Sequence, residues 1–177
     1  AGELAGNDIV IVMVGNDADV AAVTTGPGGL LSAIDPARAP LVVIMSSVLP
    51  RTILAAAEAR GAKNAIVVDA PVSGGPVRAA EATISIMAAG PDAHSADLKP
   101  VFDALGRPLF YCGPVGRAAG VKIVNNILGV ANRLRMNEAV QRATALGIDR
   151  PFLTDVMEVS SGRSWALRNY PAYRDLV

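Results

Sequence analysis

The chain has 177 residues, 51% of them apolar, and its 16 Lys and Arg balance its 16 Asp and Glu. This length suits one ordinary domain or parts of two, and the high apolar content excludes a disordered protein. A net charge of zero, without a long run of one sign, argues against a nucleic-acid partner, because phosphate binding needs a concentrated basic surface.

Cysteine and histidine each occur once, as Cys112 and His94. One cysteine cannot form an internal disulfide, and the pair is too small for a metal cluster, so we expect no metal and a cytoplasmic setting. No apolar run approaches the roughly 20 residues that span a bilayer, and we expect no membrane partner. The chain starts at Ala1 and stops at Val177 without a helix cap, so we expect both ends to be cut.

Short apolar runs rich in β-branched residues alternate with helical stretches. Strands of this kind are buried on both faces, as in parallel sheets covered by helices. The alternation predicts an α/β fold with a doubly wound parallel sheet and right-handed crossovers. Strands are expected at residues 9–14, 41–45, 65–68, 83–88 and 109–112, with helices at 17–25, 50–60 and 91–105 between them.

The alternation of strands and helices ends near Gly116, and one long helix is predicted over residues 117–146. Its apolar residues recur at spacings of three and four, which defines an apolar face. Helices near 30 residues usually bridge two domains or form an oligomer interface, so we expect a homo-oligomer, a dimer or a tetramer. We place the domain boundary between residues 115 and 116, and we predict another helix at 151–161.

The segment Asp69-Ala-Pro-Val-Ser-Gly-Gly75 directly follows a predicted strand. Ligands of open α/β sheets collect at the carboxyl ends of strands, and adjacent glycines let backbone N–H groups approach an anion. With the Ser73 hydroxyl, the segment predicts a small carboxylate-binding loop. A glycine-rich turn without a ligand is the competing interpretation.

Lys122 and Asn126 are four residues apart on the long helix and therefore share one face. Their helical neighbours are apolar: Val121, Ile123, Val124, Ile127 and Leu128. Apolar surroundings disfavour the charged form of a lysine and lower its pKa, which a lysine general acid/base requires. The alternative is a lysine that extends to water and has no catalytic role.

Together, the D-A-P-V-S-G-G segment and the later Lys122-Ile-Val-Asn125-Asn126 resemble the β-hydroxyacid dehydrogenase family, typified by 3-hydroxyisobutyrate dehydrogenase. The resemblance covers nearly the whole chain. Residues 45–50, M-S-S-V-L-P, look like the family's S-T-x-x-P stretch near the nicotinamide, and residues 13–16 look like a strand-end loop that packs against the cofactor.

The resemblance implies an oxidoreductase that transfers a hydride between NAD or NADP and a small 3-hydroxy acid. Lys122 would be the general acid/base, Asn126 would hydrogen-bond the substrate, and residues 1–115 and 116–177 would belong to the NAD(P)-binding and helical domains. The remaining implied contacts are Ser73, Gly74 and Gly75 for the substrate carboxylate, and Met13, Val14, Gly15, Asn16 and Ser47 for the cofactor.

Four features depart from the family's pattern, and one of them is that the expected helical domain stops early. The glycine fingerprint G-x-G-x-x-G is absent, so the first βαβ unit and the residue that selects NAD or NADP are missing, and we expect an incomplete sheet with an exposed edge. Ala82 and Ala118 also occupy positions where glycine is usual.

Several alternatives stay open at this point. The chain could be a truncated, non-catalytic module for ligand binding or assembly. It could also be an enzyme like 6-phosphogluconate dehydrogenase, although that family's lysine motif typically reads K-x-x-H-N. Imine reductases share the fold but commonly lack the lysine.

Overall fold

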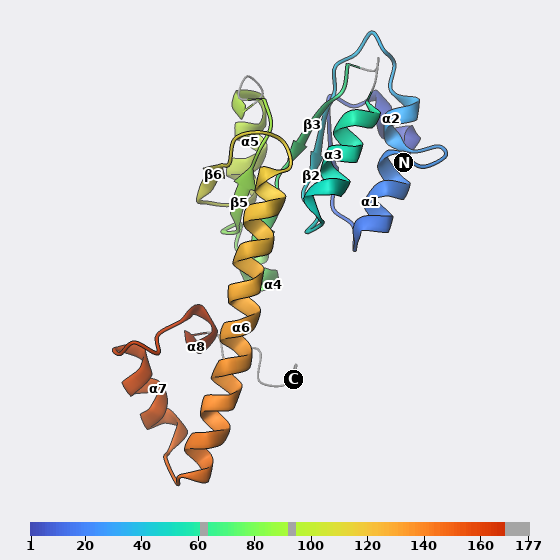
Figure 1. Cartoon of the computed structure of the whole chain (residues 1–177). Coiled ribbons are helices and arrows are strands. Elements are labelled where there is room, and N and C mark those ends of the chain that lie inside the picture. Colours follow the sequence, from blue (N-terminus) through green and yellow to red (C-terminus); the bar gives the residue numbers. More distant parts are fainter. Residues whose placement is uncertain (61–63, 92–94, 169–177) are drawn as a thin grey trace. The chain divides into compact units, whose positions relative to one another are not determined.

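The structure is a computed structural model that describes residues 1–60, 64–91 and 95–168, so His94 lies outside the described residues. The chain divides into two compact units, Ala1–Ile123 and Val124–Val177, which are described separately. Figure 1 shows their helices and strands in the colours of the sequence.

A parallel sheet forms the centre of the first unit. Strands β1 (Ile9–Val12), β2 (Leu41–Ile44) and β3 (Ile66–Asp69) lie in that order, with Ile9 opposite Leu41 and Leu41 opposite Ile66. The predicted α/β class with a parallel sheet is confirmed. Among the described strands, β1 pairs only with β2, so its other edge carries no strand.

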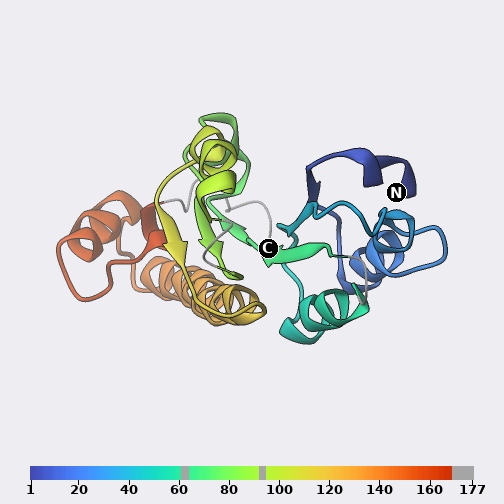
Figure 2. The same ribbon diagram turned by 90° about the horizontal axis from the view of Figure 1, so that it is seen from above.

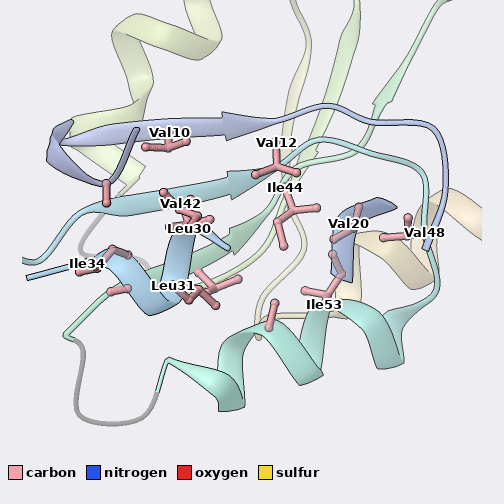
Figure 3. Packing of buried hydrophobic residues seen from close by; sticks show 14 of the residues in the cluster. Val10, Val12, Val20, Leu30, Leu31, Ile34, Val42, Ile44, Val48 and Ile53 are labelled. Atoms are coloured by element: carbon pink, nitrogen blue, oxygen red, sulfur yellow. The ribbon is translucent and has the colours of Figure 1, made fainter. Parts of the chain in front are cut away.

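One face of this sheet packs against helices from the first half of the chain. These are the 3-10 helix η1 (Gly2–Gly6) and helices α1 (Asp17–Thr24), α2 (Leu30–Ala33) and α3 (Pro50–Ala59). Figure 3 shows Val12 of β1 and Ile44 of β2 near Ile53 of α3 in the buried cluster. Both predicted helices of this region are present, and α2 is a helix that the sequence did not predict.

The other face carries the alternate side chains of the same strands. Val43 of β2 and Val68 of β3 pack with Phe102 of α5 (Ser95–Leu105) in a second buried cluster. Because successive strand residues point to opposite faces, the apolar runs fill both clusters. This is the doubly wound arrangement expected from the sequence.

A second, smaller sheet contains β4 (Val72–Ser73), β5 (Ser85–Ala88) and β6 (Leu109–Tyr111), and helix α4 (Gly75–Ala80) follows β4. Strand β5 is parallel to β6 but antiparallel to β4, with Ser73 opposite Ser85. The sequence did not predict β4, because two residues inside a glycine-rich segment carry no strand periodicity. Asp69 and Ala89 form an isolated bridge from β3.

Helix α6 (Arg117–Ala145) begins in the first unit and continues into the second, and Figures 1 and 2 show it as one uninterrupted helix. In the second unit, Met136 of α6 packs with Met157 of α7 (Arg150–Glu158) and Leu167 of α8 (Trp165–Arg168). The predicted long helix is therefore present, and α7 ends three residues earlier than expected. No helix in the described part of the chain has the length and apolar character needed to cross a membrane.

Candidate active site

Lys122 is buried in the first unit, with only 8% of its surface exposed. It shares a face of α6 with Ala118 and Ala119, which are fully or almost fully buried one turn earlier. Burial lowers the pKa of the Lys122 amine below its ordinary value of 10.5, because charge is disfavoured away from water. Within the described residues, no carboxylate pairs with it. A lysine in this state can exchange a proton.

The apolar surroundings of Lys122 differ from those that the sequence predicted. Val121, Val124, Ile127 and Leu128 are all exposed in the structure. They point away from the face of α6 that carries Ala118 and Ala119, because the helical repeat of 3.6 residues separates the two sets. The burial of Lys122 thus comes from the fold around the first turns of α6 and not from its sequence neighbours.

Asp69 is a buried, hydrogen-bonded residue of this region to which the sequence analysis gave no role. This last residue of β3 has a fully buried carboxylate. One carboxylate oxygen accepts a hydrogen bond from the Gly116 N–H at 3.0 Å, and the other accepts from the Ala119 N–H at 2.9 Å. Asp69 thereby joins the D-A-P-V-S-G-G segment to the start of the helix that carries Lys122. Two sequence features could have indicated this contact. Asp69 is a single carboxylate at the end of an apolar strand, and Gly116, which directly precedes the predicted long helix, has no side chain to cap that helix.

Gly116 has φ +89°, and a Cβ there would lie 3.3 Å from the Leu54 side chain. Glycine also lacks the side chain that normally caps a helix start. The Asp69 carboxylate supplies that cap from the end of β3. Burial raises the pKa of Asp69 above its ordinary value, and the N–H donors of Ala119 and Gly116 oppose that rise.

Ser73, Gly74 and Gly75 connect β4 to α4. Ser73 is half-buried, and Gly74 has φ +145°, where a Cβ would lie 2.8 Å from the Cβ of Arg78. Gly75 also has a positive φ, +70°. Gly74 therefore requires glycine and the conformation of Gly75 favours it, and the backbone N–H groups of these two residues have no side chains of their own beside them.

The residues predicted to contact the cofactor lie at the carboxyl ends of β1 and β2. The Ser46 hydroxyl accepts a hydrogen bond from the Val14 N–H at 2.8 Å, which ties the two loops together. Met13 and Ser47 are exposed on these loops, with 62% of Met13 accessible. Such strand ends are where ligands of open α/β sheets bind, so these residues fit a cofactor.

The other two residues of the first loop differ in what they offer. Gly15 is exposed. The Asn16 side chain accepts from the Asp19 N–H at 3.0 Å and caps α1, so this side chain already has a structural role. Asn126 is exposed and belongs to the second unit, one turn after Lys122 on α6.

A pocket of about 430 Å³ opens between α3 and the turns at residues 90–91 and 113–115. Its lining includes Ala57, Val67 and Arg60, whose guanidinium donates to the Ala65 carbonyl. None of the residues predicted for the site lines it. Lys122 and Asp69, whose burial and hydrogen bonding are unusual, do not line this pocket. We therefore define the candidate site by these two residues and not by the pocket.

Two family models together match nearly the whole chain. Residues 1–113 match the NAD binding domain of 6-phosphogluconate dehydrogenase, and residues 116–174 match the NAD-binding domain of NADP-dependent 3-hydroxyisobutyrate dehydrogenase. The cofactor of these domains is NAD or NADP, as the sequence predicted.

Known relatives agree with these matches. The chain is 36% identical to 3-hydroxyisobutyrate dehydrogenase of Pseudomonas aeruginosa over 93% of its length, and 35% identical to 2-(hydroxymethyl)glutarate dehydrogenase of Eubacterium barkeri over 92%. It spans 55% and 54% of these two relatives, about half of each. The solved structure of Mycobacterium tuberculosis 3-hydroxyisobutyrate dehydrogenase with L-serine superposes with a TM-score of 0.82 at 28% identity, covering 93% of this chain and 55% of that one.

The family models, the sequence relatives and the solved structure thus all match this chain to the same group of enzymes, in its first part and in its second. The chain belongs to the β-hydroxyacid dehydrogenase family.

Proposed function

We propose that the protein containing this chain is an NAD(P)-dependent oxidoreductase for small 3-hydroxy acids, with Lys122 as its general acid/base. The observation that carries the proposal is the burial of Lys122 without a charged partner among the described residues, on the turn of α6 that follows the Asp69 cap. A buried lysine without an ion pair is costly to a fold, and a proton-transfer role accounts for it.

In the oxidation direction, the neutral amine of Lys122 accepts the proton of the substrate hydroxyl while the carbon–hydrogen bond of the alcohol breaks and a carbonyl forms. The nicotinamide supplies the hydride acceptor. In reduction, the Lys122 ammonium returns the proton to the oxygen. The pKa of Lys122, lowered by burial, makes both protonation states available nearer neutral pH than an ordinary lysine allows.

Ser73, Gly74 and Gly75 are proposed to bind the substrate carboxylate through the hydroxyl and backbone N–H groups. Asn126 is proposed to hydrogen-bond the substrate, on the basis of its spacing from Lys122 along α6. Met13, Val14, Gly15, Asn16 and Ser47 are proposed for the cofactor, with Asn16 acting through its backbone because its side chain caps α1.

The names of the relatives support a proposal for the substrate class. L-Serine, 3-hydroxyisobutyrate and 2-(hydroxymethyl)glutarate each carry a hydroxymethyl group on the carbon beside a carboxylate. We infer that this protein acts on a 3-hydroxypropanoate with a substituent at carbon 2. Steady-state rates with these three acids and either cofactor measure the preference.

The decisive experiment replaces Lys122 in the purified protein and measures hydroxy-acid oxidation. Lys122→Ala should lower kcat by about 10²-fold or more, the scale of general acid/base catalysis, with the affinity for cofactor unchanged. Lys122→Arg should not restore activity, since a guanidinium stays protonated and cannot accept the hydroxyl proton.

Lys99→Ala is the matched control, because Lys99 is an exposed lysine of α5 whose partner is Asp103. It should keep wild-type turnover. Turnover of the Lys122→Ala variant near the wild-type value would remove Lys122 from the mechanism.

The match of residues 1–113 to a 6-phosphogluconate dehydrogenase domain keeps that activity as a second candidate. The lysine motif K-I-V-N-N and the names of the relatives favour the smaller hydroxy acid. Oxidation of 6-phosphogluconate in the same assay distinguishes the two. The two family models meet at residues 113–116, which supports a domain boundary between residues 115 and 116, whereas the compact units of the structure divide inside α6, after Ile123. A homo-oligomer and a cytoplasmic setting remain predictions.

A further inference from the structure

We propose that Asp69 is a positioning residue for Lys122: its carboxylate fixes the start of α6 and thereby places the amine against the substrate loop. This inference rests on the proposed function, and it adds a residue for which neither the sequence motifs nor the family resemblance gave a role.

The backbone of Asp69 is fixed by hydrogen bonds of both its N–H and its carbonyl group. Its N–H donates to the Ala89 carbonyl at 3.1 Å, and its carbonyl accepts from the Ala89 N–H at 2.8 Å. Three residues further, Val72 and Ser73 pair with β5, and the Pro71 carbonyl accepts from the Met87 N–H at 3.0 Å. The carboxylate therefore projects from a backbone that the two sheets fix in place.

The other end of the contact is the first turn of α6, whose backbone N–H groups have no acceptors within the helix. Asp69 satisfies two of them, on Gly116 and Ala119. A negative charge at this end also interacts favourably with the helix dipole. Lys122 follows Ala119 by three residues, or roughly 4.5 Å along the axis, so a shift of the cap moves the amine almost directly.

Asp69 itself does not reach the substrate. Its side chain is fully buried, and both carboxylate oxygens are already hydrogen-bonded within the protein. Burial, and not a charged neighbour, accounts for the pKa of Lys122, so Asp69 acts on the lysine by position. A displacement of about 1 Å at a reacting group is enough to lower a rate by up to 10²-fold.

The test is Asp69→Asn, which keeps the shape of the side chain but turns one acceptor oxygen into a donor that faces an N–H. Three measurements follow: kcat/KM for the hydroxy acid, KM for the cofactor, and the rate at which an amine-selective reagent modifies Lys122. We expect kcat/KM to fall by about tenfold or more, an unchanged cofactor KM, and faster modification of Lys122 as the first turn loosens.

Phe102→Leu is the control for simple loss of stability. Phe102 is fully buried in the same unit, in a hydrophobic cluster that contains no residue of α6. At a temperature where Asp69→Asn and Phe102→Leu are folded to the same extent, the Phe102→Leu variant should keep the wild-type kcat/KM and the wild-type rate of modification at Lys122. Equal losses in the two variants would overturn the positioning role.

Wild-type protein provides a second measurement if Asp69→Asn does not fold. As Asp69 is protonated by acid, the backbone amide signals of Gly116, Ala119 and Lys122 should shift with one midpoint. A Lys122 amide signal that does not shift as Asp69 is protonated would contradict the proposal. If wild-type protein oxidises none of the acids, the proposed function fails while the amide and modification data still decide the role of Asp69.

Discussion

The Ser46 hydroxyl accepts a hydrogen bond from the Val14 N–H across 2.8 Å, joining the loops that follow β1 and β2. Ser46 is buried, whereas its neighbour Ser47 is exposed. Two consecutive serines thus have different tasks: one fixes the geometry of the proposed cofactor site, and the other is available to a ligand.

Replacing Ser46 with alanine should leave the Val14 N–H without its acceptor. Because this hydrogen bond is part-buried, its loss should lower the free energy of unfolding by about 0.5–1.5 kcal/mol, which denaturant titration measures. Cofactor affinity should fall as well, because the loop carrying Met13 and Gly15 loses its anchor. Ser47→Ala is the matched control and should leave the free energy of unfolding unchanged, since Ser47 is exposed. Equal destabilisation by both substitutions would contradict this division of tasks.

Asp17 at the start of α1 also joins two separate parts of the chain through its side chain. Its carboxylate accepts from the Thr52 hydroxyl and from the Leu49 N–H, the latter at 3.0 Å, and these hydrogen bonds lower the pKa of Asp17. A carboxyl whose folded pKa is depressed stabilises the fold above its unfolded pKa and loses that contribution as pH falls through the folded value.

We therefore expect Asp17→Asn to be less stable than wild type at pH 7, with the difference shrinking below the ordinary pKa of 3.8. Thermal unfolding across this range is the measurement. Asp19→Asn serves as the control, because no hydrogen bond to its carboxylate is found among the described residues. A gap between wild type and Asp17→Asn that stays constant with pH would show that the carboxylate charge is irrelevant.

Ala82 has φ +52° and is the non-glycine residue with a positive φ in the described part of the chain. The left-handed region costs an L-residue roughly 1–2 kcal/mol, and glycine adopts it freely, at some cost in unfolded-state entropy. Ala82→Gly should therefore stabilise the protein by about 0.5–1 kcal/mol net. Ala79→Gly, inside α4, should destabilise the protein instead, so the two substitutions should have opposite signs in denaturant titration.

Lys122 should show its lowered pKa directly when the signals of lysine Cε atoms are titrated by nuclear magnetic resonance. Because the folded state binds fewer protons than the unfolded state between the two pKa values, the free energy of unfolding should rise with pH up to the ordinary value of 10.5. Lys122→Met should raise the melting temperature at pH 7, and this gain should shrink toward pH 10.5. The exposed Lys99, replaced in the same way, should produce no such gain. A Lys122 titration at the ordinary pKa would contradict the prediction.

The sequence by itself determined the class of fold and the sites of the main elements. Buried parallel strands are continuous β-branched runs, so β1, β2 and β3 were visible from local composition. Pro50 at the start of α3 marked a helix boundary in the same local way. The two motifs that carry Lys122 and Ser73 were likewise recognisable because each is a short, contiguous pattern.

Only the tertiary structure decided how those motifs are connected. The contact of Asp69 with Ala119 spans 50 residues, and no local periodicity encodes a cap supplied from the end of β3. The burial of Lys122 had the same origin, since its sequence neighbours Val124 and Leu128 are exposed and the packing of the first turn of α6 excludes water instead. Burial and long-range hydrogen bonds depend on which elements meet, and that is a property of the folded chain as a whole.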